Sequence, residues 1–292
     1  MATLYEEVRA ALRETAFRPK KSRGQNFLIH ERVLDAIMGL LDLAPQDEVL
    51  EIGPGLGFLT RRLLAAAAQV WAVEIDGALV DWLRRGPLAA QPALHLVQDD
   101  ILKVSLDGML PPRKVKLVGN LPYSISTPVL FRLFDWRDHF SALVLMVQKE
   151  VADRISSGVG TKNYGTLSVW CQVHGRVTDK VAVSPEAFYP RPKVRSTVLK
   201  IELYGEPLIA AADLAALRAL VRAAFGQRRK TLANALTPAL RLDRSRIEEL
   251  LRAQDIDPQR RGETLGVAEF IRIARAVNRS ALLKTDGRPL RA

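Results

Sequence analysis

The stretch EIGPGLG at residues 51–57 decides the fold. It joins the apolar run VLEI at 49–52 to a helix-like stretch at 59–68. Glycines at such a junction permit a tight turn and allow a ligand to approach the backbone closely. A strand, a glycine turn and a helix in this order are typical of a βα unit in a parallel sheet.

Strands and helices continue to alternate beyond this turn. Further short apolar runs are VWAVE (70–74), LHLVQ (94–98), KLVGN (116–120), ALVLMVQ (142–148) and LSVWCQV (167–173). The stretch 77–85 suits a crossover helix. This alternation predicts an α/β fold with a Rossmann-like, doubly wound parallel sheet. The alternating run 197–203 predicts a last, antiparallel strand beside the one near 167–173.

Strand signals stop after Tyr204-Gly205-Glu206-Pro207. The apolar residues of 213–225 recur on one helical face. Ser245 and Glu248 have the spacing of a capping box at a helix start, and a further helix is expected over 268–277. We therefore predict two domains, an α/β domain over residues 1–205 and a small all-α domain over residues 206–292.

The composition indicates a globular protein with a polyanionic partner. Of the 292 residues 48% are apolar, and the net charge is +11. A single cysteine, Cys171, cannot form an internal disulfide. The N-terminal residues are too charged for a signal peptide, and no run approaches the ~20 apolar residues that span a bilayer. We expect a cytoplasmic, monomeric protein with no membrane association, and basic groups such as Arg228-Arg229-Lys230 favour nucleic acid as the partner.

Polar residues end four successive predicted strands. Gly53 and Gly55 follow the first, Glu74 ends the second, Asp99 ends the third and Asn120 ends the fourth. Ligands bind outside the carboxyl ends of such strands, so these groups should converge. A glycine turn with an acid about twenty residues later also describes nicotinamide enzymes, in which the acid binds the ribose. The polar ends of the third and fourth strands favour a different cofactor.

The element Asn120-Leu121-Pro122-Tyr123 suits methylation of an amine conjugated to an aromatic ring. The lone pair of such an amine is delocalised, so two acceptors must hold its hydrogens and orient the nitrogen. The side-chain oxygen of Asn120 and the carbonyl of Leu121 can do so, since the following proline restricts where that carbonyl points. Tyr123 can then stack on the base. The four histidines have no ligand spacing, so we predict no metal site.

Longer sequence motifs surround these residues. They are KKSRGQNFL (20–28), LEIGPGLGFLT (50–60), VEID (73–76), QDD (98–100), GNLPYSIS (119–126), QKEVADRI (148–155), FYPRPKVRSTV (188–198) and RRKTL (228–232). In these motifs the sequence resembles the ribosomal RNA adenine dimethyltransferases, most closely those of the small subunit (16S), and the resemblance covers nearly the whole chain. The resemblance implies a class I methyltransferase sheet and S-adenosylmethionine as the cofactor.

The resemblance also implies roles for individual residues. Gln25, Asn26 and Leu28 would cover the methionine part of the cofactor, with Gly53 and Gly55 beneath it. Glu74 would bind the ribose, Asp99 the adenine amino group, and Asn120 would lie between cofactor and target. Phe188 would form a second aromatic wall opposite Tyr123, although its residue type alone suggests core. Apart from the resemblance, the charge of Arg228, Arg229 and Lys230 leads us to expect that they contact RNA phosphates.

The implied substrate is a pair of adjacent adenosines in the 3′-terminal hairpin loop of 16S rRNA, within an assembling small subunit. Three positions depart from the pattern of the family. Arg23, Asp100 and Gly226 stand where an apolar residue, a small residue and asparagine are usual. These departures affect what we expect of the packing of the segment over the cofactor, of the contacts with the cofactor's ring and of the contacts with RNA. None of them lies in the motifs that carry the catalytic residues.

Three other functions are weighed against this one. A large-subunit rRNA methyltransferase would share the site and differ in product. An assembly factor would act mainly by binding the subunit. A nicotinamide dehydrogenase would need a catalytic base that the sequence does not display.

Overall fold

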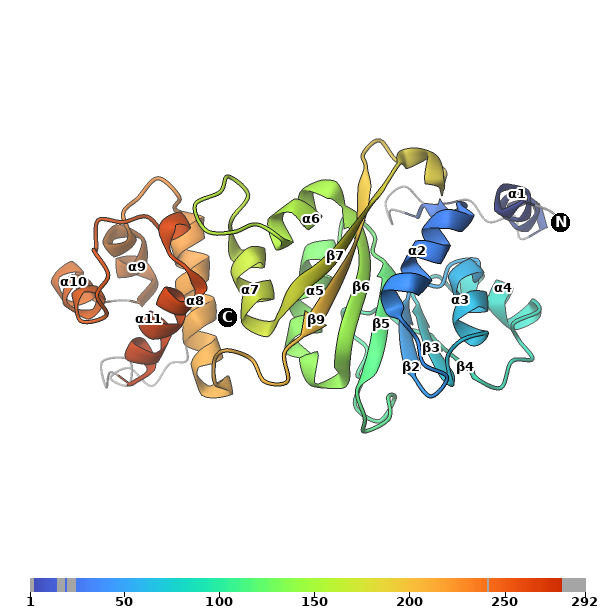
Figure 1. The fold of residues 1–292 in the computed structure, drawn as a ribbon, viewed down its shortest axis with the longest axis horizontal. Helices are drawn as coiled ribbons and strands as arrows, with labels where there is room; N and C mark the ends of the chain where they lie inside the picture. The colour runs from blue at the N-terminus through green and yellow to red at the C-terminus, as the bar shows by residue number, and fades with distance from the viewer. Residues whose placement is uncertain (1–2, 15–18, 20–24, 241, 280–292) are drawn as a thin grey trace. The chain divides into compact units, whose positions relative to one another are not determined.

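The computed structural model describes residues 3–14, 19, 25–240 and 242–279 (Figure 1). A basic group near the N-terminus, which comprises Arg18, Lys20, Lys21 and Arg23, lies outside these ranges. The strands are β1 (Phe27–Leu28), β2 (Glu48–Ile52), β3 (Gln69–Glu74), β4 (Leu94–Gln98), β5 (Val115–Asn120), β6 (Phe140–Gln148), β7 (Gly175–Val183), β8 (Phe188–Tyr189) and β9 (Ser196–Leu203). The helices are α1 (Leu4–Glu14), α2 (Glu31–Leu41), α3 (Phe58–Leu64), α4 (Gly77–Arg85), α5 (Ser126–Asp135), α6 (Lys149–Ile155), α7 (Thr166–His174), α8 (Ala211–Gly226), α9 (Leu232–Leu240), α10 (Arg244–Arg252) and α11 (Val267–Arg279).

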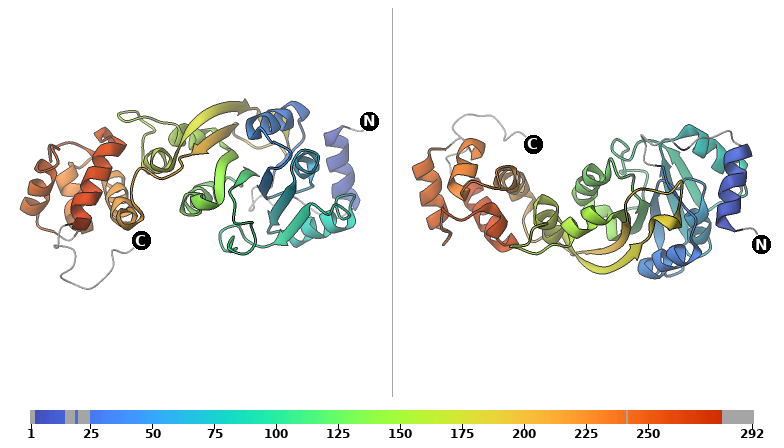
Figure 2. Two further views of the ribbon diagram at one scale, coloured as in Figure 1. Left: turned by 60° about the horizontal axis from the view of Figure 1, so that its bottom comes forward. Right: turned by 90° about the horizontal axis from the view of Figure 1, so that it is seen from above.

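A seven-stranded sheet in the order β4-β3-β2-β5-β6-β9-β7 forms the centre of the α/β part. The strands from β2 to β6 pair in parallel, and β9 pairs antiparallel with β6. All five residues of β2 are buried, as expected for a strand covered on both faces. Helices lie on both faces of the sheet (Figure 2). The predicted doubly wound α/β fold is confirmed.

The strand predicted at 167–173 is wrong, because these residues form helix α7. Seven of its nine residues are buried, so no polar face marks a helical period. A continuous apolar run does not distinguish a buried strand from a buried helix. The helix start is marked by a bond in which the Gly165 N–H donates to the Ser168 hydroxyl (3.0 Å). The neighbour of β9 on the far side from β6 is instead β7, which begins where α7 ends.

The chain divides into two compact units. One comprises residues 1–152 and 176–203, and the other comprises residues 153–175 and 204–292. The second unit is helical, with α8 packed on α9 and α11, and α10 on α9. The sequence-based boundary at 205/206 lies close to the last division, but it assigned 153–175 to the first domain.

Tyr164 shows why residues 153–175 belong with the helices. Its hydroxyl donates to the Leu265 carbonyl (2.9 Å), and its ring meets Phe225 edge-on at 5.5 Å. Only 1% of the residue is exposed. A buried tyrosine with a satisfied hydroxyl joins distant parts of the chain in a way that no local pattern reveals.

The capping box predicted at Ser245 is also wrong. Helix α10 begins at Arg244 after Asp243, so Ser245 lies inside the helix. Glu248 instead accepts hydrogen bonds from Arg244 (2.9 Å) and Arg252 (3.0 Å) on successive turns. Arginine partners at i±4 compete for the carboxylate that the capping box requires.

Cys171 is buried, as expected of a core thiol, and burial raises its pKa to about 12. The thiol is therefore not a reactive nucleophile at neutral pH.

Among the helices of the described ranges, none has the length and apolar character needed to cross a membrane.

The turn after β2 requires glycine at its last position. Gly57 has φ +85°, and an added Cβ would lie 2.7 Å from Leu88 Cδ1 and 2.8 Å from Leu83 Cδ2. Gly108 has a similar φ of +78° with nothing within 4 Å of an added Cβ. The two positions separate the backbone effect from the packing effect.

We predict that Gly57→Ala lowers the free energy of unfolding by about 2–4 kcal/mol, since left-handed backbone and overpacking both act there. Gly108→Ala should cost only about 1–2 kcal/mol, from the backbone alone. Urea unfolding of both variants measures the difference. Equal losses would show that the leucines move aside freely.

Candidate functional site

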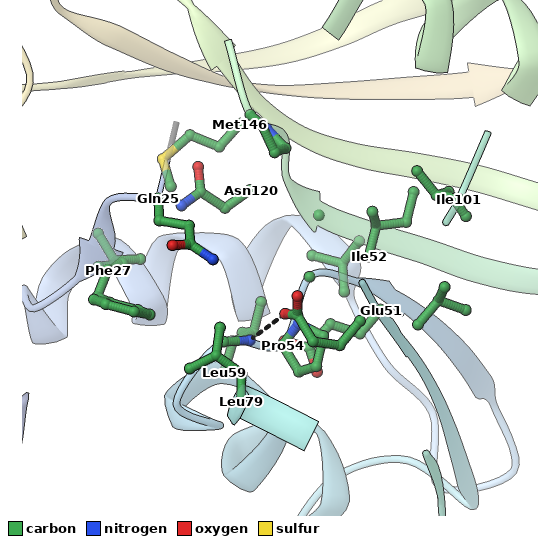
Figure 3. A pocket seen from close by; sticks show the side chains of 18 of the residues that line it. Gln25, Phe27, Glu51, Ile52, Pro54, Leu59, Leu79, Ile101, Asn120 and Met146 are labelled. Carbon is green, nitrogen blue, oxygen red and sulfur yellow. Dashed lines mark hydrogen bonds between the residues drawn. The ribbon is translucent and has the colours of Figure 1, made fainter. Parts of the chain in front are cut away.

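A large pocket lies at the carboxyl ends of the parallel strands. It encloses about 1160 Å³, including space that opens to solvent. Its walls include every residue of the predicted cofactor set, which comprises Gln25, Asn26, Leu28, Gly53, Gly55, Glu74, Asp99 and Asn120. In Figure 3, Gln25 and Asn120 lie on one side of the pocket and Glu51 and Pro54 on the other. The predicted convergence of four strand ends is confirmed.

The glycine turn forms the floor of this pocket. Gly53, Gly55 and Gly57 have φ values of +68°, +59° and +85°, a region that side chains disfavour. The Gly53 N–H donates to the Val73 carbonyl (2.9 Å), which ties the turn to the neighbouring strand. A Cβ on Gly55 would lie 3.3 Å from the Phe27 ring. The turn therefore keeps its backbone close to the pocket and to residues 25–28, which line the pocket beside it and are called the covering segment below.

Glu74 lies at the end of β3 and is only 5% exposed. Its carboxylate accepts the Gly55 N–H (3.3 Å) and the Asp76 N–H (2.9 Å). Burial raises the pKa of this carboxyl, while the two backbone bonds lower it. Glu74 thus presents a buried acceptor at the pocket, which suits the hydroxyls of a sugar.

Glu51 was given no role by the sequence, yet it lines the same pocket with 2% exposure. Burial, together with the nearby charge of Glu74, raises its pKa to about 7, although the Thr60 hydroxyl, which donates a hydrogen bond to it at 2.6 Å, acts to lower the pKa. Its place directly before the glycine turn was the available signal. The sequence could not show that its neighbouring carboxylate is equally buried.

Asn120 connects the end of β5 with the covering segment. Its side-chain Nδ2 donates to the Asn26 carbonyl at 3.1 Å. Because the amide NH₂ is turned toward Asn26, the opposite side-chain oxygen is oriented as an acceptor. The next residue, Leu121, is buried, and its N–H donates to the Met146 carbonyl (3.0 Å). The backbone before Pro122 is therefore held by the Leu121 N–H and by the side chain of Asn120.

The covering segment is anchored at a second place, where the Gln25 amide donates to Asp76 (3.2 Å). Leu28 is 8% exposed and pairs with Phe188 in the β1–β8 ribbon. Asp99 is exposed at the far side of the pocket, where its carboxylate accepts the Asp100 N–H (2.7 Å). The pocket thus has an acid at each of two neighbouring strand ends and an amide at a third.

Comparison with known proteins identifies the family. A family model described as ribosomal RNA adenine dimethylase matches residues 16–275. The chain belongs to the ribosomal RNA adenine dimethylase family. It is a methyltransferase enzyme.

Several relatives of this rRNA adenine dimethylase are named ribosomal RNA small subunit methyltransferase A. That of Geobacter metallireducens is 44% identical over 91% of this chain and 98% of its own length. That of Syntrophotalea carbinolica is 46% identical over 89% and 97%. Among solved structures, a dimethyladenosine transferase from Plasmodium falciparum has a TM-score of 0.74 at 27% identity, covering 85% of this chain and 95% of its own. The 23S rRNA methyltransferase ErmE has a TM-score of 0.65 at 25% identity, covering 87% and 100%.

The two aromatic residues predicted to sandwich a base differ in this dimethylase. Tyr123 is half-buried, and its hydroxyl hydrogen-bonds the Ser196 hydroxyl at 2.7 Å. Phe188 is 3% exposed and packs in the hydrophobic core with Leu28 and Leu34. Its burial agrees with what the residue type alone suggests, and neither ring is part of the pocket wall. The stacking roles of both residues stay predictions.

The basic cluster of the dimethylase lies in its helical unit, between α8 and α9. Arg228, Arg229 and Lys230 are all exposed. The Arg228 guanidinium, however, donates to the carbonyls of Lys162 (3.0 Å) and Tyr164 (3.2 Å). No cluster of metal-binding side chains occurs among the residues that the structure describes.

The raised pKa of Glu51 makes stability depend on pH. When unfolded, Glu51 loses its proton near its ordinary pKa of 4.5, whereas the folded protein keeps that proton up to about pH 7. The folded state therefore binds more protons in this window, and the free energy of unfolding falls as the pH rises.

We predict that this fall disappears in Glu51→Gln, which has no proton to lose. The stability of the wild type relative to this variant should decrease between pH 4.5 and 7 by on the order of 3 kcal/mol. Urea unfolding across this range tests the prediction. Parallel pH profiles for the two proteins would contradict it, and Asp99→Asn, at an exposed acid, serves as the control.

Proposed function

We propose that this enzyme transfers methyl groups from S-adenosylmethionine to the exocyclic amines of two adjacent adenosines in the 3′-terminal hairpin loop of 16S rRNA. The reaction would occur in the cytoplasm, on an assembling small subunit. The observation that carries the proposal is the Asn120 side chain. Its donor is engaged by Asn26, so its acceptor oxygen is available to an incoming amine at the edge of the pocket.

The pocket residues fit S-adenosylmethionine. Glu74 would accept hydrogen bonds from the ribose hydroxyls, and Asp99 would accept from the adenine amino group. The floor at Gly53 and Gly55 would lie beneath the cofactor, with Gln25, Asn26 and Leu28 over its methionine part. When bound, the cofactor supplies a methyl group already activated as a sulfonium.

The chain's own residues would then act by positioning. The Asn120 oxygen and the Leu121 carbonyl would accept the two amine hydrogens, which directs the nitrogen lone pair at the methyl group. The bond from the Leu121 N–H to Met146 keeps this peptide in place. Orientation of this kind supplies up to ~7–11 kcal/mol of a reaction barrier. Tyr123 would stack on the adenine, and the exposed cations of the helical unit would bind phosphates.

The names of the curated relatives support a small-subunit substrate. The likeness to ErmE supports the second candidate, a large-subunit rRNA as substrate, because both reactions need the same site. An assembly role that depends on binding alone would not require the Asn120 geometry.

The deciding experiment incubates the enzyme with methyl-labelled S-adenosylmethionine and either undermethylated small subunits or large subunits. We expect dimethyladenosine that maps to the 3′-terminal hairpin of 16S rRNA. Label confined to large-subunit rRNA would select the second candidate. Cofactor binding without labelled adenosine in either subunit would refute the proposed chemistry.

Two variants should separate cofactor binding from base positioning. Glu74→Gln should weaken S-adenosylmethionine binding about tenfold or more, since a buried charged acceptor is lost. Tyr123→Ala should leave that binding unchanged and lower turnover roughly tenfold to a hundredfold, because stacking on a base is worth ~1–3 kcal/mol. Calorimetry and single-turnover methylation measure the two effects.

Tyr123→Phe is the matched control, since it keeps the ring and removes only the hydroxyl that meets Ser196. It should retain most of the activity. Equal losses of cofactor binding in Tyr123→Ala and Glu74→Gln would count against a stacking role. Phe188 offers no such test, because its substitution also removes contacts in the core.

A further inference from the structure

Three loops of the helical unit meet at Arg228. The first is the connection from α6 to α7, over residues 156–165. The second is the turn from α8 to α9, which holds Arg228, and the third is the segment 257–266. Arg228 Nη2 donates to the carbonyls of Lys162 (3.0 Å) and Tyr164 (3.2 Å), and Nε lies 3.5 Å from the Glu263 carboxylate. The guanidinium thus binds both other loops at once.

Other bonds give the first loop a defined shape. The Gly160 N–H donates to the Glu263 carbonyl (3.1 Å), and the Thr161 hydroxyl donates to the Gly158 carbonyl (2.7 Å). Gly160 has φ +78°, a conformation that glycine adopts without strain. The loop is therefore ordered by backbone contacts that converge on Arg228 and Glu263.

The exposed side chains around this junction are basic or polar. Thr161, Lys162 and Asn163 are exposed on the first loop, and Arg229 and Lys230 on the second. Within the described part of the chain, the side chains of Lys162, Arg229 and Lys230 have no acidic partner. Arg260, by contrast, is neutralised by Glu269 at 2.6 Å. Three cations are thus available to a polyanion on two loops that Arg228 holds together.

We infer that Arg228 is a positioning residue, which presents Lys162 beside Arg229 and Lys230 as one surface for the phosphates of an RNA. The inference rests on the proposed rRNA substrate and changes the role expected of Arg228. Two of its donor groups are directed at protein carbonyls and Glu263, so its main effect on RNA passes through the first loop. Lys162, far away in sequence, becomes an RNA-contacting residue.

A double-mutant cycle tests this inference. Binding of a short hairpin RNA is measured against salt concentration for wild type, Arg228→Gln, Lys162→Gln and the double variant. Each single change should weaken binding about fivefold at 0.1 M salt and lower the salt slope by about 0.7–0.9, the value of one phosphate contact. The double variant should be no weaker than Arg228→Gln, because the Lys162 contact is already lost there. Additive losses of about 25-fold, with a slope lower by about 1.5, would overturn the inference.

Two glycine variants repeat the test without any change of charge. Gly160→Ala strains the left-handed backbone of the first loop and should weaken RNA binding as Arg228→Gln does. Gly158→Ala is its control, because an added Cβ there has nothing within 4 Å and its φ is not left-handed. Wild-type binding from Gly160→Ala would contradict the role of loop shape.

Arg229→Gln distinguishes failure of this inference from failure of the proposed function. It should lower the slope by about 0.7–0.9 whether or not Arg228 positions Lys162. If wild type and Arg229→Gln bind RNA alike, the surface does not bind RNA and the RNA-binding part of the proposed function fails with it. Thermal unfolding of each variant verifies that the helical unit remains folded.

Discussion

Two buried carboxylates at neighbouring strand ends are the constraint on which the site depends. Glu51 and Glu74 are almost fully buried, so both must be satisfied by hydrogen bonds from their surroundings. The donors are the Thr60 hydroxyl at the start of α3 and the amides of Gly55 and Asp76. The bond from Gly55 to Glu74 holds the glycine turn against β3, and the bond from Thr60 to Glu51 holds the start of α3, which follows the turn, against β2. The bonds that shape the pocket floor are therefore formed within the protein itself.

The covering segment is joined to this rigid floor by side-chain amides. Gln25 binds Asp76 on the β3 side, and Asn120 binds Asn26 on the β5 side. The segment thus bridges the two halves of the strand-end crevice. One consequence is that the side chain of Asn120 is oriented by its hydrogen bond to this segment.

The sequence predicted whatever depends on local pattern and on the topology of parallel sheets. Strand ends bearing Glu74, Asp99 and Asn120 meet because parallel strands share an edge, and spacing alone is sufficient to infer this. Helix α7 could not be recognised, since burial on all sides removes the polar face that reveals a helical period. The hydrogen bonds of Glu51 and Arg228 involve partners, Thr60 and Lys162, that only the folded chain brings close. Ser245 failed as a cap because arginines at i±4 hold Glu248.

Because residues 153–175 belong to the helical unit, the two units of the enzyme are not consecutive parts of the chain. The chain passes from one compact unit to the other after residues 152, 175 and 203, so the helical unit is assembled from two separate stretches. Truncation after residue 203 would leave Tyr164 without Phe225 and Leu265, and would expose apolar surface on the remaining fragment. The helical unit therefore cannot be removed by cutting the chain at a single point. Exchange of it between related enzymes would have to transplant both stretches together.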